Sequence, residues 1–209
     1  MHPTVKKATL LIILLSVLGI LAWSVNWFLK KRTTAIRLSA RSEQSVTRRV
    51  LENTIIYRQR DAQWVNEKTG GSEETLGDVG CTVCCLSMAM AQHGLALNPA
   101  ELNRKLKEAG GYTEKGWVKW DQVQNATGGR IAVELPPSPS HEIIEKALEA
   151  GNPVLVKVYL APEVQHWVLL VGREGTEYLM KDPLGDGKSL RPLSSYGSDI
   201  FAVRIVRAH

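Results

Sequence analysis

Residues 78–94 read DVGCTVCCLSMAMAQHG, a stretch of small and apolar residues bounded by glycines. Residues 81–93 are predicted to form a helix that ends at Gly94, because glycine suits a left-handed C-terminal cap. Cys81 would occupy the first turn of this helix, where unpaired backbone N–H groups and the helix dipole favour a thiolate. Cys84 and Cys85 lie further along among apolar residues, and we expect both in the core.

The remaining chain predicts an α+β domain. Helices are expected mainly first and strands last, which argues against an alternating parallel sheet. Trp117 and Trp120, three residues apart in one expected helix, either pack in the core or line a cleft. The expected helices cover residues 81–93, 99–109, 117–124 and 141–150, and the expected strands cover residues 50–57, 130–135, 153–160, 165–172, 177–181 and 201–206.

The N-terminal residues predict a membrane anchor. Residues 8–29 carry no formal charge and, at about 1.5 Å per residue, are long enough to cross the roughly 30 Å hydrocarbon layer. A cleaved secretory signal is the alternative, but the apolar run continues beyond the poor cleavage site at residues 22–24. We expect a tail over residues 1–7, a retained single-pass helix over 8–29, a basic tether over 30–50 and one domain over 51–209.

Charge is distributed unevenly along the chain. Its formal net charge is +5, yet residues 1–50 alone hold nine basic residues and one acidic residue. The rest holds 17 basic and 20 acidic residues, so we expect no nucleic-acid partner, because phosphate contacts need basic residues on the folded surface. Basic residues beside the apolar span instead predict contact with anionic membrane lipid. More of them follow the span than precede it, which favours a cytoplasmic domain and leaves the exported side open.

A catalytic thiol needs a base, and His166 is the best placed of the five histidines. It opens the apolar strand of residues 166–172 and can project from a rigid element. A short loop centred on Glu174 would set His166 opposite Asp182 on an adjacent antiparallel strand, with Cβ atoms about 4.5–5.5 Å apart. The carboxylate could then orient the imidazole and stabilise its cation. The alternatives are a structural histidine and a turn aspartate before Pro183.

The cysteines could have two roles other than that of a nucleophile: dithiol redox chemistry and zinc binding. Cys81 and Cys84 form a C-x-x-C pair, as in dithiol redox proteins, although the strand–helix–strand pattern of thioredoxin-like domains does not surround it. Zinc binding by the three cysteines and His93 fails on geometry, because twelve helical residues separate Cys81 from His93 by about 18 Å. We expect no metal and no organic cofactor, and the redox reading stays open.

Four motifs follow one another in order: YRQRDAQW at residues 57–64, Gly80-Cys81 opening a helix that contains Met88 and Met90, HWVLLVG at residues 166–172, and Asp182-Pro183. Over about residues 55–206 the chain resembles the papain-like cysteine peptidase family thirty-nine, the bacteriocin-leader-processing type, and especially its standalone relatives. The resemblance implies a papain-like α+β fold whose Cys helix packs against an antiparallel sheet. Exporters of this family also carry transmembrane and ATP-binding domains, which this sequence does not, so transport-coupled leader processing is not expected.

Carried over by position, the resemblance makes Cys81 the nucleophile, His166 the general base and acid, and Asp182 the orienting residue. Gln59 matches the glutamine whose amide completes the oxyanion hole with the Cys81 N–H, although from the sequence alone it could be a solvated loop residue. The expected function is hydrolysis of peptide or protein amide bonds by a membrane-anchored cysteine peptidase. The alternatives are an inactive peptide-binding relative and a thiol redox protein that uses Cys81 and Cys84.

Overall fold

A computed structural model of the chain describes residue 19, residues 37–161 and residues 164–209. The expected N-terminal tail over residues 1–7, the expected membrane helix over residues 8–29 except Gly19, and the start of the expected tether lie outside the described residues. Among the described residues, no helix has the length and apolar character needed to cross a membrane. The fold described below is that of residues 37–209.

Antiparallel pairing organises the strands into one sheet, with the order β1-β4-β3-β6-β2 and with β5 paired to β4. The strands are β1 (Arg41–Val50), β2 (Ile131–Glu134), β3 (Val154–Ala161), β4 (Val164–Lys181), β5 (Arg191–Pro192) and β6 (Ala202–Ala208). The helices are α2 (Leu76–Val79), α3 (Cys81–Gln92), α4 (Pro99–Glu108), α5 (Gln122–Ala126) and α6 (His141–Glu149), with a 3-10 helix at Leu193–Tyr196. The expected α+β class with an antiparallel sheet is confirmed.

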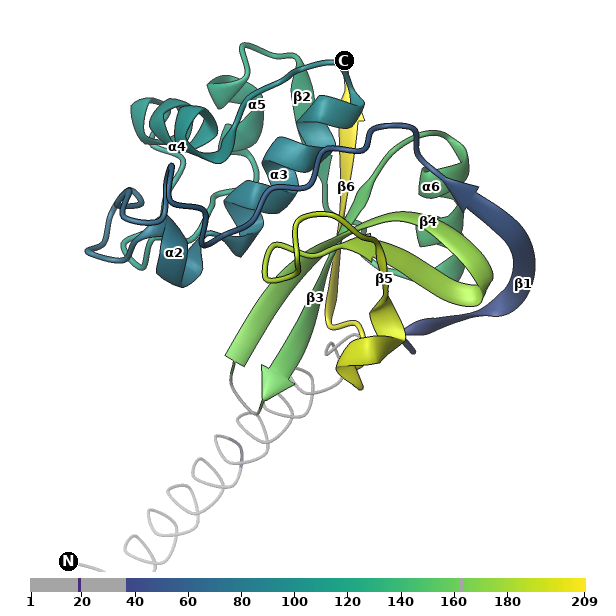
Figure 1. The fold of residues 1–209 in the computed structure, drawn as a ribbon. Coiled ribbons are helices and arrows are strands. Elements are labelled where there is room, and N and C mark those ends of the chain that lie inside the picture. Colours follow the sequence, from purple (N-terminus) through teal and green to yellow (C-terminus); the bar gives the residue numbers. More distant parts are fainter. Residues whose placement is uncertain (1–18, 20–36, 162–163) are drawn as a thin grey trace, which may run out of the picture. The chain divides into compact units, whose positions relative to one another are not determined.

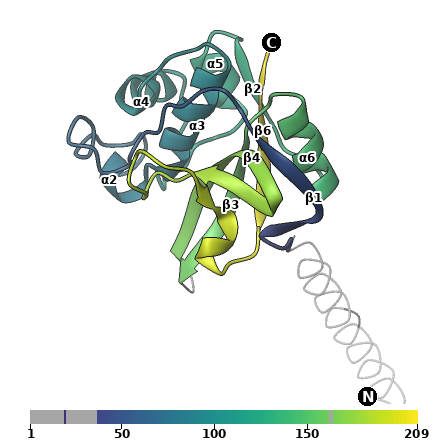
Figure 2. The same cartoon turned by 45° about the vertical axis from the view of Figure 1, so that its right-hand side comes forward.

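The helices lie on both sides of the sheet. Figures 1 and 2 show α2 to α5 gathered on one side and α6 on the other. The central strand β3 accordingly has two buried faces: Leu155 belongs to the core cluster that contains α3, whereas Val154 and Val156 belong to the cluster that contains α6. Successive side chains of a strand point to opposite faces, so one apolar run serves both cores.

Local signals in the sequence predicted the starts of α3, α4 and α6 correctly. α3 begins at Cys81, and Gly94 beyond its C-terminal end has a left-handed φ of 75°. Asn98 caps α4 by accepting from the Glu101 N–H at 3.0 Å, and the Glu101 carboxylate accepts from the Asn98 N–H at 2.8 Å. Ser140 caps α6. The expected third helix is shorter and later than predicted, because residues 112–121 form turns and a β-bridge.

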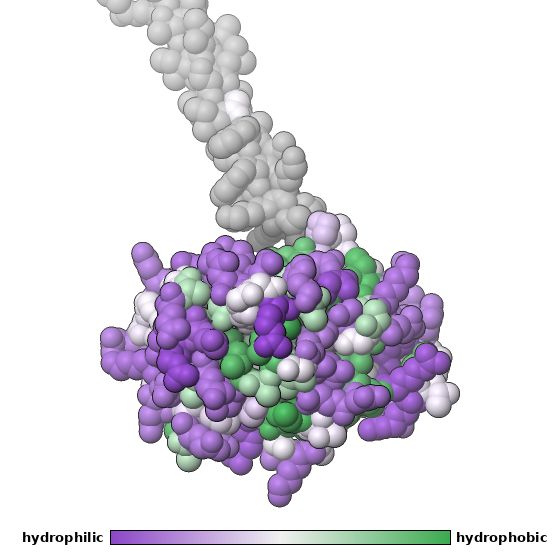
Figure 3. Space-filling view, turned by 90° about the horizontal axis from the view of Figure 1, so that it is seen from above, coloured by the Kyte–Doolittle hydropathy of each residue, from purple (hydrophilic) through white to green (hydrophobic). Residues whose placement is uncertain are grey.

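The start of the domain differs from the prediction. The sequence predicts a basic tether over residues 41–50 and a strand over residues 50–57, but β1 occupies Arg41–Val50 and no strand follows it over residues 51–57. β1 is an edge strand with only Ser42 buried, so its sequence lacks the apolar alternation that marks a strand. Because β1 belongs to the domain, the basic residues of this strand count toward its charge. Residues 37–209 contain 21 basic and 21 acidic residues, so the formal charges of this part are balanced. One face of this part is mostly hydrophilic, with hydrophobic side chains in small patches (Figure 3).

β4 replaces the two strands expected at residues 165–172 and 177–181. It is one 18-residue element, and Figure 1 shows it turning back on itself. Gly175 supports this bend with a φ of 58°, a conformation that costs glycine little. The reversal expected around Glu174 is therefore present within a single long strand, and it brings the two ends of β4 together.

A buried polar network joins β1, β4 and α6. Arg173 Nη1 lies 3.3 Å from Glu145 Oε2, and Arg173 Nη2 donates to the Ser42 hydroxyl at 2.7 Å. The Ser42 hydroxyl in turn donates to Glu145 Oε1 at 2.5 Å. All three side chains are buried. A polar edge strand is thus attached to the domain by charge-assisted hydrogen bonds as well as by its backbone pairing.

Removal of one partner from this network tests its contribution. We expect Arg173→Met to lower the free energy of unfolding by about 3–5 kcal/mol, because Glu145 is left buried without its counter-ion. The exposed pair Arg48–Glu174 joins the same two strands, so Arg48→Met is a matched control expected to cost less than about 1 kcal/mol. Urea denaturation gives the free energy of unfolding of both variants. Equal losses of free energy in the two variants would contradict a special contribution of the buried network.

Candidate active site

The junction of α2 and α3 sets the position of Cys81. Gly80 precedes it as the N-cap residue, and a Cβ atom there would lie 2.3 Å from the Leu76 carbonyl oxygen. Only glycine fits so close to the first residue of α2 without a shift of the backbone. Cys81 is therefore the first residue of α3, as predicted, and its partly exposed side chain lines a cavity of about 630 Å³.

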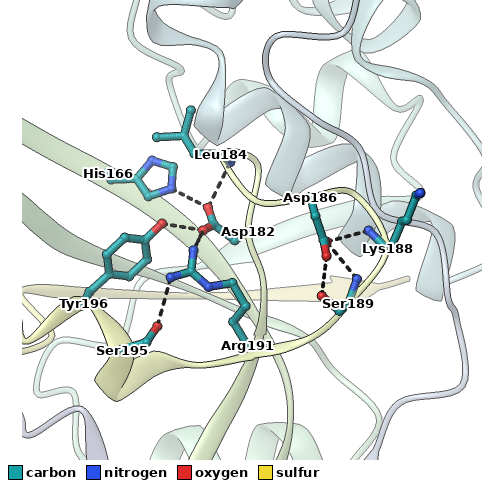
Figure 4. A network of polar contacts seen from close by, with 9 residues as sticks. All are labelled: His166, Asp182, Leu184, Asp186, Lys188, Ser189, Arg191, Ser195 and Tyr196. Atoms are coloured by element: carbon teal, nitrogen blue, oxygen red, sulfur yellow. Dashed lines mark hydrogen bonds and ion pairs between the residues drawn. The ribbon is translucent and has the colours of Figure 1, made fainter.

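His166 and Asp182 meet where the ends of β4 come together. His166 Nε2 lies 2.9 Å from Asp182 Oδ1, and both side chains are buried (Figure 4). An ionised carboxylate can only accept, so the proton of this hydrogen bond belongs to Nε2 and Nδ1 is the ring nitrogen left for another partner. The two residues are close, as predicted, but they are not direct partners on adjacent antiparallel strands: His166 pairs with Val158 of β3, and Asp182 follows the last residue of β4.

Two residues that the sequence did not reveal also bind Asp182. Arg191 Nη1 lies 2.8 Å from Asp182 Oδ2, and the Tyr196 hydroxyl donates to the same oxygen (Figure 4). The Leu184 N–H donates to Oδ1 at 2.9 Å. These donors follow Asp182 along the chain, but no residue pattern showed that β5 and the 3-10 helix would return them to it. They hold the carboxylate in one orientation and supply it with positive charge.

The charges of the site favour an ion pair between Cys81 and His166. Burial alone would raise the pKa of the Cys81 thiol, but hydrogen bonding and the positive charge of His166, with the Trp167 N–H, hold that pKa below its ordinary value. Burial alone would lower the pKa of His166, but Asp182 and Cys81 raise it to about 9. The pKa of Asp182 is lowered by His166 and Tyr196 against the effect of its burial. A thiolate and an imidazolium are thus stabilised together.

The other two cysteines lie in the core, as predicted. Cys84 and Cys85 are fully buried, and burial raises the pKa of both thiols above the ordinary value. The Cys85 thiol donates to the Trp167 carbonyl at 3.3 Å, which ties α3 to the strand residue beside His166. Within residues 37–161 and 164–209, no group of three or more His, Cys, Asp or Glu side chains is arranged to hold a metal ion.

Gln59 lies in the wall of the same cavity and is buried, so it is not a solvated loop residue. Its Nε2 donates to the Gly77 carbonyl at 2.9 Å, and its backbone N–H donates to the Pro183 carbonyl at 2.8 Å. These bonds fix the amide beside the start of α3 and connect it to the turn after Asp182. Nε2 carries a second N–H that this bond does not use.

Aromatic and cationic side chains form another part of the cavity wall. Trp117 and Trp120 both line it, and Trp120 also packs against the hydrophobic core, so the second of the two residues takes both of the positions considered. Trp167 packs edge-on against Trp120 with ring centroids 5.1 Å apart. Lys157 and Arg204 also line the cavity and were missed from the sequence. The signal for them was a cation among apolar strand residues, Lys157 in VLVKVYLA of β3 and Arg204 in AVRIVRA of β6, which also contains Arg207.

Comparisons with known proteins found a matching family model and a similar fold. A model of the peptidase C39 family matches residues 77–195, more than half of the chain; the match includes Cys81, His166 and Asp182 and begins after Gln59. The fold is similar to a crystal structure from Bacillus anthracis whose protein was described as a C39-like peptidase. That similarity has a TM-score of 0.51 at 16% identity and covers 78% of this chain and 100% of the other. A search of the curated proteins found no match.

Selective alkylation tests the state of the three thiols. At pH 6 we expect iodoacetamide to modify Cys81 at least about tenfold faster than Cys84 or Cys85, because only Cys81 has a lowered pKa and access to solvent. Mass spectrometry of the modified peptides gives the three rates. His166→Ala removes the imidazole whose hydrogen bond and positive charge lower the Cys81 pKa, so it should slow the alkylation of Cys81. Equally slow modification of all three cysteines would refute the activated thiolate.

Proposed function

The chain belongs to the peptidase C39 family, and from this premise we propose that it hydrolyses peptide bonds with Cys81 as nucleophile, His166 as acid and base, and Asp182 as the orienting residue. The family makes the chain a cysteine-type peptidase; the assignment of individual roles rests on the geometry. The observation that carries it is the buried His166–Asp182 hydrogen bond at the end of β4, beside a thiol of lowered pKa.

Acylation begins with attack of the Cys81 thiolate on the carbonyl carbon of the scissile bond. The electron pair of the carbonyl moves to its oxygen, and the new oxyanion accepts from the backbone N–H of Cys81 and from Gln59 Nε2. His166, protonated at both ring nitrogens, donates the Nδ1 proton to the leaving nitrogen as the C–N bond breaks. The products of this step are a free amine, neutral His166 and a thioester on Cys81.

Deacylation reverses the proton transfer. Neutral His166 accepts a proton from water at Nδ1 while the water oxygen attacks the thioester carbonyl. Collapse of the second tetrahedral intermediate releases a carboxylic acid and returns the thiolate and the imidazolium. Asp182 remains ionised throughout, because its four hydrogen-bond donors stabilise the charged form.

The structure offers less support for the two alternatives. A thiol redox protein would need Cys84 to attack or resolve a disulfide with Cys81, but Cys84 is fully buried and its pKa is raised. A relative that only binds peptides would have no use for a histidine of raised pKa beside an acidic thiol. Both observations favour hydrolysis over the alternatives.

We further propose that residues 8–29 anchor the domain to a membrane by a single span, with residues 30–36 as a short basic connection. Support comes from the sequence, since these residues lie outside the described part of the chain: an uncharged run long enough to span, flanked by basic residues suited to anionic lipid. The charge asymmetry favours the cytoplasmic side. Alkaline carbonate extraction should leave the full chain in the membrane pellet and release Leu14→Arg/Leu18→Arg. Release of both would contradict the anchor.

Peptide turnover tests the proposed roles directly. A mixture of synthetic peptides is incubated with the protein, and new termini are identified by mass spectrometry. We expect Cys81→Ala to abolish cleavage, Gln59→Ala to lower kcat by about 10²–10³ through loss of an oxyanion donor, and Cys84→Ala to retain most activity. Circular dichroism verifies that each variant is folded. If loss of Cys84 is as damaging as loss of Cys81, the dithiol mechanism replaces the proposed one.

A further inference from the structure

Two cations share one face of the sheet inside the cavity. Lys157 in β3 pairs directly with Trp167 in β4 on one side and with Ala202 in β6 on the other. Arg204 lies two residues beyond Ala202, so its side chain projects from the same face as those of Lys157 and Trp167. Lys157, Trp167 and Arg204 all line the cavity that contains Cys81 and His166.

Aromatic rings hold Arg204 in place. Its guanidinium carbon lies 5.2 Å from the centroid of the Trp120 ring and 5.6 Å from that of Trp167. Nη1 donates to the Val203 carbonyl at 2.7 Å. Cation–π contacts of this kind stabilise a guanidinium while leaving its charge uncompensated. The group is thus fixed in the wall before any substrate arrives.

Within the described part of the chain, no carboxylate neutralises these two charges. Neither Lys157 nor Arg204 forms a salt bridge with any residue of 37–161 or 164–209, whereas Arg207 on the same strand β6 pairs with Glu134 at 2.6 Å. Among the described residues that line the cavity, the acidic one is Asp78, whose carboxylate accepts from the Thr75 hydroxyl at 2.6 Å. Among the described residues of this wall, the two cations therefore have no carboxylate counter-ion.

Burial makes the uncompensated charges costly. It lowers the pKa of Arg204, and it lowers the pKa of Lys157 together with the nearby charge of Arg204. Arg204 Nε is also buried without a hydrogen-bond partner among the described residues. Two partly desolvated cations side by side repel each other, and an anion placed between them and the solvent would offset that repulsion.

We propose that Lys157 and Arg204 form a subsite for a carboxylate of the substrate. The inference rests on the proposed peptidase function and narrows its substrates to peptides that place a carboxylate in this part of the cavity. A planar guanidinium matches the geometry of a carboxylate, and an ammonium group beside it adds a second donor. The carboxylate belongs either to a Glu or Asp side chain near the scissile bond or to the C-terminus of the peptide, which the experiment separates.

Peptide binding to the full chain carrying Cys81→Ala measures this preference without turnover. The probes are acetyl-Ala-Ala-Glu-Ala-amide, acetyl-tetraalanine with a free C-terminus, and acetyl-tetraalanine amide, titrated calorimetrically at low ionic strength. We expect one carboxylate-bearing peptide to bind roughly tenfold more tightly than the neutral amide, and which one identifies the source. Adding Arg204→Gln or Lys157→Gln should remove most of this difference. Arg207→Gln, which removes an exposed charge from the same strand, should preserve it.

Equal binding of the three peptides, no binding, or an equal effect of Arg207→Gln would overturn the subsite. Cleavage by the chain with Cys81 intact is scored separately on the peptide mixture. If peptides are cleaved but binding shows no preference for a carboxylate, the subsite fails and the peptidase function stands. If the preference is present but no peptide is cleaved, the proposed hydrolysis fails while the subsite stands.

Discussion

The buried carboxylate of Asp182 is the group on which the site depends. Moving a carboxylate out of water costs several kcal/mol unless its oxygens are well supplied with donors. Here His166 and the Leu184 N–H bind one oxygen, and Arg191 and Tyr196 bind the other. These donors come from β4, from the turn after it, from β5 and from the 3-10 helix. The Asp182 carboxylate is therefore ionised only when this whole C-terminal segment is correctly folded. Its negative charge keeps His166 protonated beside Cys81.

A second constraint places the thiol against this pair. Gly80 sets the backbone position of Cys81, because a Cβ atom at residue 80 would collide with the Leu76 carbonyl oxygen at the start of α2. The Trp167 carbonyl then accepts from the thiol of Cys85, which lies one turn along α3 from Cys81. Helix and strand are thus held together at the point where the nucleophile meets the base. In the same cavity, the neighbouring cations Lys157 and Arg204 form the subsite that we propose for a substrate carboxylate.

The sequence predicted those features that depend on local signals. A glycine followed by a helix-forming run located the start of α3, and strand alternation with a turn placed His166 near Asp182. It failed where stability comes from partners distant in the chain. β1 is polar and is held by pairing with β4 and by the Ser42 network, so composition assigned it to a tether. The return of Arg191 to Asp182 likewise depends on tertiary folding, and the family resemblance supplied Gln59 where the residue pattern alone did not.

The ionisation of His166 is the most direct test of the account. In a sample labelled with ¹⁵N-histidine, the ring nitrogens report both the proton position and the pKa of His166. The structure predicts titration at about pH 9, with the Nε2 proton retained above that pH, and a clear fall in the pKa when Asp182 is replaced by Asn. Titration of His166 at or below its ordinary value of 6.5 in the unaltered protein would contradict the ion pair on which the mechanism rests.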